Sequence, residues 1–173
     1  MTVHSILQYP DKRLRIAGKP VEQFDDRLRA LISDMAETMY AAPGVGLAAP
    51  QIGVSLQLFI VDVSIAESEP SHLQVFINPQ IIERHGEIDF EEGCLSFPGA
   101  REFIGRSERV RVRAQDAEGK WFELEAEGLL SIAIQHENDH LQGKLMIDHL
   151  SPLRRRLLHR TMAKRAANVA VAV

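Results

Sequence analysis

Residues 136–140 read His-Glu-Asn-Asp-His and follow, after Gln135, a run that is largely apolar, 129–134. On a helix, residues four apart lie on the same face, so His136 and His140 can bind one metal ion together. Glu137 lies about 100° around the helix, where it can reach an attacking water without being a ligand. Two unrelated histidines on a helix are the alternative. However, the apolar run would bury the helix, and uncompensated polar side chains are costly in a core.

Two histidines do not complete a catalytic metal site, which needs three protein ligands and one open position. A metzincin-type metalloprotease would place a third His six residues after His140, where this chain has Met146. A thermolysin-type site needs a later Glu, and no Glu follows Glu137. We therefore expect the third ligand to come from upstream in the chain.

Cys94 is the best upstream candidate, since a thiolate is a strong ligand for zinc or iron(II). It lies in the segment Glu-Glu-Gly-Cys-Leu-Ser, where Gly93 would let the backbone come close to a neighbouring segment. A lone cysteine is often only a small buried apolar residue. The need for a third ligand favours the metal role. A single cysteine also excludes an internal disulfide, which fits a reducing cytosol.

The segment 44–53, Gly-Val-Gly-Leu-Ala-Ala-Pro-Gln-Ile-Gly, combines small residues with one amide side chain. Its glycines would allow a substrate backbone to approach closely. Gln51 could donate a hydrogen bond of the kind that stabilises an oxyanion. A tight buried turn is the alternative interpretation. In either case we expect this segment to be a loop.

The hydrophobic pattern predicts an α+β fold, with mainly antiparallel sheets packed around the central 129–142 helix. A first helix should run from a cap at Asp25 or Asp26 to Ala42, and Gly143 should follow the end of the central helix. Strands are expected at 56–63, 75–79, 81–88, 110–114 and 122–126, the last two forming a hairpin, with a surface loop at 66–71. A terminal helix should begin at Ser151–Pro152 and place Leu153, Leu157, Leu158 and Met162 on one side. The length of 173 residues fits one domain, 1–173, with a helical tail at about 151–173.

Charge and hydropathy exclude several classes of function. The net charge of −4 does not suggest DNA binding, and no apolar run is long enough to span a membrane. The first residues lack a targeting pattern, so we expect a cytoplasmic protein. Between Ser151 and Arg165, however, the chain has six basic residues and no acidic one. A solvated helix face is one explanation for this tail, and docking on RNA is the other.

Three motifs occur in the order typical of one family: GVGLAAPQIG at 44–53, EGCLS at 92–96 and QHENDH at 135–140. With them the chain resembles the peptide deformylases, and its extended tail is similar to that of the bacterial type 1 members. The similarity covers the chain from Leu7 to about Leu153. The resemblance implies a metal-dependent hydrolase that removes the formyl group from the N-terminal formylmethionine of new polypeptides and releases formate.

The resemblance also implies a role for each matching residue. Cys94, His136 and His140 would bind one divalent metal ion, usually Fe(II) in this family, with Zn, Ni or Co as possible substitutes. Glu137 would move protons, while Gln51 and the backbone N–H of Leu95 would hold the oxyanion. The cleft for the nascent peptide would be lined by Val45, Gly46, Glu92, Gly93, Arg101, Ile132 and Ala133. The tail would dock on the ribosome near the exit tunnel.

Two other functions remain open on the residues alone. One is an HExxH metallopeptidase that cuts internal peptide bonds, although it lacks the expected downstream ligand. The other is a non-enzymatic binding module stabilised by metal, in which His149 would supply a fourth ligand and close the site.

Overall fold

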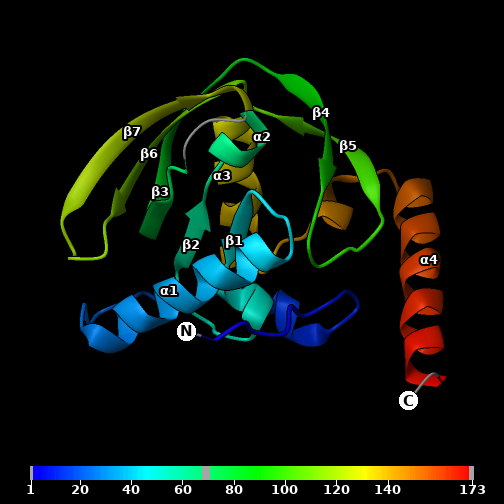
Figure 1. Ribbon diagram of the computed structural model, residues 1–173. Coiled ribbons are helices and arrows are strands. Elements are labelled where there is room, and N and C mark those ends of the chain that lie inside the picture. Colours follow the sequence, from blue (N-terminus) through cyan, green and yellow to red (C-terminus); the bar gives the residue numbers. More distant parts are fainter. Residues whose placement is uncertain (1, 68–70, 172–173) are drawn as a thin grey trace.

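A computed structural model of the chain describes residues 2–67 and 71–171 (Figure 1). The α-helices are α1 (Asp26–Ala41), α2 (Ser64–Glu67), α3 (Gly128–Leu141) and α4 (Pro152–Val171), and the 3₁₀ helices are η1 (Lys12–Arg15), η2 (Ala49–Ile52) and η3 (Met146–His149). The strands are β1 (Gly46–Ala48), β2 (Leu58–Val61), β3 (Gln74–His85), β4 (Ile88–Gly93), β5 (Arg101–Arg106), β6 (Arg109–Gln115) and β7 (Trp121–Glu127). None of the helices within these described ranges is long and apolar enough to cross a membrane.

The strands form two sheets, and within each sheet all neighbouring strands are antiparallel. One sheet has the order β1-β2-β3-β6-β7, and the other contains only β4 and β5. Helix α3 contacts β1, β2, β6 and β7 and lies at the centre of the molecule, while α1 packs on β1 and β2 (Figure 1). This arrangement confirms the predicted α+β class with a central helix.

The first helix forms where its cap and its apolar stripe predict it. The Asp25 carboxylate accepts hydrogen bonds from the N–H groups of Arg27 and Leu28, which satisfies two donors of the first turn. Leu28, Ile32, Met35 and Met39 are buried along one face. Packing of this stripe against β1 and β2 holds the segment 44–53 in place.

The central helix begins at one glycine with a left-handed backbone conformation and is followed by a second, two residues after its last residue Leu141. Gly128 has φ of +59° and Gly143 has φ of +69°, which other residues rarely adopt. A Cβ on Gly143 would also overlap the carbonyl oxygen of Arg15. Unlike an ordinary amphipathic helix, α3 buries His136, Glu137 and His140 among its apolar residues. The helix therefore brings the predicted site into the protein interior.

The predicted hairpin is present, with Val112 opposite Leu124 and a turn in which Gly119 N–H bonds to Asp116 O. The strands predicted at 75–79 and 81–88 are divided differently in the structure. One strand, β3, runs from Gln74 to His85 and joins the two segments, whereas Ile88 already belongs to β4. A shift of register between Ile77 and Gln80 accommodates Pro79. A strand can carry a proline where its ladder is irregular.

Three further predictions need correction. The segment expected as loop at 44–53 contains the short strand β1 and the helix η2. Residues 64–67, at the start of the expected loop 66–71, form one helical turn, and 68–70 lie outside the described residues. In α4 only Leu158 and Met162 are buried, whereas Leu153 and Leu157 are 64% and 50% exposed. Helix α4 lies at the side of the molecule and packs mainly on η3 (Figure 1). It therefore buries only one narrow face, and the rest of its surface is exposed.

Candidate metal centre

Three potential metal-binding side chains meet where the end of β4 approaches α3. Cys94 follows β4, while His136 and His140 lie one turn apart on α3. Their ligand atoms all lie within 4.8 Å of one another. The Cys94 Sγ is 3.4 Å from His140 Nε2, and the two imidazole rings are 5.1 Å apart. The structure thus brings together the three residues that the sequence predicts as ligands.

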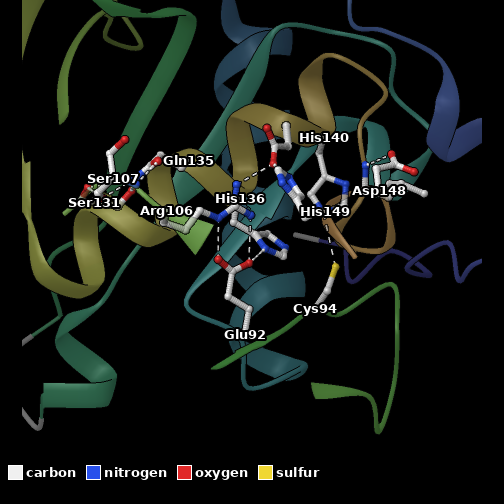
Figure 2. A network of polar contacts seen from close by, with 12 residues as sticks. Glu92, Cys94, Arg106, Ser107, Ser131, Gln135, His136, His140, Asp148 and His149 are labelled. Carbon is white, nitrogen blue, oxygen red and sulfur yellow. Dashed lines mark hydrogen bonds and ion pairs between the residues drawn. The ribbon is translucent and has the colours of Figure 1, made fainter. Parts of the chain in front are cut away.

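A buried carboxylate orients the first of the two histidines. Glu92 accepts a hydrogen bond from His136 Nδ1 at 2.7 Å, and Arg106 donates to the same carboxylate through Nε at 2.6 Å and Nη2 at 3.0 Å. Figure 2 shows Glu92 between the Arg106 guanidinium and the His136 ring. Burial alone would raise the pKa of Glu92, but the bonds from Arg106 and His136 lower it. With Nδ1–H donating, the other ring nitrogen of His136 is available to a metal.

The charges at this site favour a cation. Burial lowers the pKa of His140 well below its usual value, so its imidazole is neutral, as a ligand must be. Burial also acts to lower the pKa of His136, but the neighbouring Cys94 sulfur and Glu92 raise it well above the usual value. A positive charge is therefore favoured at His136, between the Cys94 sulfur and the Glu92 carboxylate. A divalent metal ion would supply that charge, and two imidazoles with one thiolate suit zinc or iron(II).

Glu137 lies in the same buried space without a hydrogen bond to one of its oxygens. The residue is only 5% exposed, and Oε2 has no partner among the described residues. Burial raises the pKa of Glu137 to about 7. The carboxylate also packs on Gly46, where an added Cβ would be 2.5 Å from Oε1. It is thus a carboxyl group that can exchange protons near neutral pH.

The two predicted oxyanion donors differ in their present bonding. The N–H of Leu95 donates to no acceptor among the residues that the structure describes. The Gln51 side chain accepts from Ala48 N–H at 2.9 Å, and its Nε2 is 3.1 Å from Ser96 Oγ and 3.7 Å from Cys94 Sγ. Gln51 is therefore fixed beside the sulfur, with its amide hydrogens already bonded. Ser96 as its partner was not predicted, because a serine next to a cysteine carries no distinctive signal.

A cavity of about 730 Å³ opens above these side chains, between the unpaired edges of β1 and β4. All predicted site residues except His140 line it: Val45, Gly46, Gln51, Glu92, Gly93, Cys94, Leu95, Arg101, Ile132, Ala133, His136 and Glu137. The lining also includes residues that sequence reasoning missed, among them Pro43, Phe90, Glu91 and the segment 97–100. Arg101 is at the rim, where it pairs with Glu91.

Two sequence interpretations fail at this site. His149, the suggested fourth ligand, lies outside the ligand cluster and bonds to Asp139 at 2.7 Å, so the described residues do not close the site with four ligands. No close neighbour requires a glycine at residue 93, because an added Cβ would make only ordinary contacts, with Arg101 at 3.5 Å and the Ala100 carbonyl oxygen at 3.8 Å. The close approach occurs at Gly46 instead. Arg106 and Asp139, which join the network around Glu92, were not predicted, because charged residues in a strand and on a helix usually face solvent.

A cysteine and two histidines beside a buried carboxylate, at the base of an open cleft, form the kind of site that metal-dependent hydrolases use. The comparisons with known proteins agree. The sequence model of the polypeptide deformylase family matches residues 3–156. Peptide deformylase 1 of Burkholderia multivorans is 50% identical over 165 residues, which are 95% of this chain and 90% of that protein.

Solved structures give the same result. A peptide deformylase from Legionella pneumophila has a TM-score of 0.90 and 50% identity and covers 98% of both chains. The peptide deformylase of Ehrlichia chaffeensis in complex with actinonin has a TM-score of 0.89 and 36% identity over 95% of this chain and 98% of that one. The chain belongs to the polypeptide deformylase family, whose members are metalloenzymes that remove the N-formyl group from formylmethionyl nascent polypeptides.

Proposed function

We propose that this chain deformylates nascent polypeptides at the centre formed by Cys94, His136, His140 and Glu137. The observation that carries the proposal is geometric. Three ligand atoms within 4.8 Å of one another lie beside a buried carboxylate whose Oε2 is unpaired, at the base of an open cleft. A structural site would be closed by a fourth ligand and would give Glu137 no role.

A divalent metal held by the three ligands would act as a Lewis acid and make water acidic enough to attack at neutral pH. We assign Fe(II) as the native ion, with Zn, Ni or Co as substitutes. Fe(II) binds a given site more weakly than Co, Ni or Zn does, so one of these ions can replace it during purification. A thiolate ligand beside iron would also make the protein sensitive to oxygen.

The substrate would lie extended between the unpaired edges of β1 and β4, bonded through its backbone. Val45, Ile132 and Ala133 would receive the methionine side chain, because they supply apolar surface next to the metal centre. Gly46, Glu92 and Gly93 would line the cleft on both sides of the peptide, and Arg101 would lie at its entrance. Only the formylmethionyl end would be deeply enclosed, so the residues after it would contribute little to substrate specificity.

Glu137 takes a proton from the attacking water, and the oxygen adds to the formyl carbon. The free N–H of Leu95 donates a hydrogen bond to the negative oxygen that develops. The Gln51 amide, which now lies against the Cys94 sulfur, rotates so that one of its N–H groups donates to the same oxygen. Glu137 then gives its proton to the leaving nitrogen as the C–N bond breaks. The products are formate and a free α-amino group.

The tail provides a second part of the proposal, namely that the protein works in the cytoplasm on the ribosome. Arg156, Arg160 and Lys164 lie four residues apart and so share one face of α4. They form no ion pair within the described residues, unlike Arg154, which is paired with Glu102. This basic stripe, defined as Arg156, Arg160 and Lys164, suits the phosphates of ribosomal RNA.

Formate release tests the catalytic proposal. After anaerobic purification and metal analysis, the protein should release formate from formyl-Met-Ala-Ser and leave blocked peptides without a formyl group intact. Cleavage of internal bonds in the blocked peptides, without formate release, would identify an HExxH metallopeptidase instead.

A further inference from the structure

A chain of hydrogen-bonded polar side chains leads from the surface to His136. His149 Nε2 is 2.7 Å from Asp139 Oδ2, which also accepts from Arg106 Nη1 at 2.7 Å. The Arg106 guanidinium donates two hydrogen bonds to the Glu92 carboxylate, which accepts a third from His136 Nδ1. The side chains become less exposed along this path, from 21% at His149 and 18% at Asp139 to 3–8% at the other three. His149 is thus the end of the path that is nearest to solvent.

The direction of the outermost hydrogen bond follows from the ion pair between Asp139 and Arg106. Asp139 Oδ2 accepts from Arg106 Nη1 at 2.7 Å, so the carboxylate is the acceptor in this part of the network. A carboxylate can only accept, so His149 Nε2–H donates to the same oxygen. Because His149 and Arg106 share one oxygen, the imidazole fixes the position of the atom on which the guanidinium rests.

We propose that His149 is a positioning residue of the metal centre, acting on His136 through Asp139, Arg106 and Glu92. The inference rests on the proposed role of His136 as a metal ligand. Without the imidazole, Asp139 would have Arg106 alone on Oδ2 and could turn about its side-chain torsions. The Arg106 fork would then lose its second support, and the carboxylate that holds the His136 ring would be less firmly placed.

The location of His149 suits such a role. It is the last residue of η3, whose Met146 and Ile147 are buried in the cluster that also contains Leu158 and Met162 of α4. This packing keeps the backbone of residue 149 in place, so its ring can serve as a fixed donor. Outer partners of metal-binding histidines typically change metal affinity by about 10- to 100-fold. The direct partner of His136 is Glu92, and His149 lies three residues further out, so its effect should fall at the low end of that range.

The test compares metal affinity and the visible spectrum of the Co(II)-loaded protein across matched variants. His149→Leu removes the donor, and His149→Gln keeps an amide N–H near the Nε2 position. His159→Leu is the control, because His159 also makes one 2.7 Å hydrogen bond, to Tyr9, but lies outside the network. We expect His149→Leu to bind metal about tenfold more weakly, with a shifted Co(II) band and a lower kcat at unchanged KM. His149→Gln and His159→Leu should match the unaltered protein.

An unchanged affinity and Co(II) band in His149→Leu would overturn the proposal, and so would an equal loss in His159→Leu. If His149→Leu does not fold, His149→Asn replaces it, since asparagine is polar but too short to reach Asp139 with its amide. Cys94→Ala separates this inference from the ligand assignment. Metal loss in Cys94→Ala with no effect at His149 would refute only the positioning role, whereas full metal binding in Cys94→Ala would refute the assignment itself.

Discussion

The Glu137 carboxylate packs directly on the Cα of Gly46, so that a methyl group at residue 46 would lie 2.5 Å from Oε1 and 2.9 Å from Cγ and Cδ. Gly46→Ala must therefore displace the proposed proton carrier. Because catalysis depends on the position of such a group, we expect kcat to fall by about 100-fold while the metal content is unchanged.

Gly105→Ala is the matched control, since a Cβ there would meet only Asp89 Oδ1 at an ordinary 3.5 Å. Formate-release kinetics and metal analysis of both variants check the prediction. Equal kcat values for Gly46→Ala and the unaltered protein would show that the position of Glu137 does not control the reaction.

Arg106 is the cation of a buried network, with its side chain only 4% exposed between Glu92 and Asp139. Arg106→Met would leave two carboxylates buried without their partner, so we expect the free energy of unfolding to fall by about 3–5 kcal/mol. Arg101→Met breaks an exposed ion pair with Glu91 and should cost about 1 kcal/mol or less. Urea unfolding measures the free energy of unfolding of both variants. Equal losses in Arg106→Met and Arg101→Met would contradict the claim that the buried ion pairs of Arg106 contribute more than the exposed pair of Arg101.

Asp62 fixes the end of β2 to the neighbouring loop and to α1. It is fully buried and accepts hydrogen bonds from the side chains of Ser64, Tyr40 and Ser71 and from His72 N–H. Burial would raise the pKa of Asp62, but these bonds lower it to about 2. In the unfolded chain it is about 3.9, so the stabilisation is complete above about pH 5 and is lost as the pH falls towards 2.

The shift from about 3.9 to about 2 corresponds to about 2.5 kcal/mol. The stability difference between the unaltered protein and Asp62→Asn should therefore shrink by about that amount between pH 5 and pH 2. Urea unfolding at several pH values checks this, and two parallel stability curves would be inconsistent with a lowered pKa.

The basic stripe of α4 can be tested by charge reversal. Changing Arg156, Arg160 and Lys164 together to Glu should abolish co-sedimentation with ribosomes, while formate release from a short peptide stays the same. Binding of the unaltered protein should also weaken steeply with salt, because phosphate contacts release counterions. Undiminished co-sedimentation of the triple variant would leave the stripe as an ordinary solvated surface.

The sequence predicted those parts of the fold in which pattern and environment agree. Helix α1 has a capped start and a regular stripe, and β6 and β7 alternate apolar and polar residues. The β4–β5 hairpin escaped prediction because its inward face includes Glu92 and Arg106 as well as Ile104. Buried charges that satisfy each other break the alternation on which strand prediction depends.

The site could be predicted where chemistry needs particular residue types at a fixed spacing. The helical spacing of His136 and His140 indicated the metal, and the search for a third ligand led to Cys94. The supporting residues could not be predicted, because Arg106, Asp139 and His149 approach one another only through the packing of β5, α3 and η3. Likewise, only the fold reveals that Gly46 makes room for Glu137.

Glu137→Gln tests the central claim most directly, because it removes the proton carrier and keeps the size of the side chain. The three proposed ligands remain, so the variant should still bind one metal ion per chain. Its rate of formate release from formyl-Met-Ala-Ser should fall by about 10³-fold, the effect expected for loss of a general base. Metal retention with this loss of turnover would support the proposal, whereas formate release at the unaltered rate would contradict it.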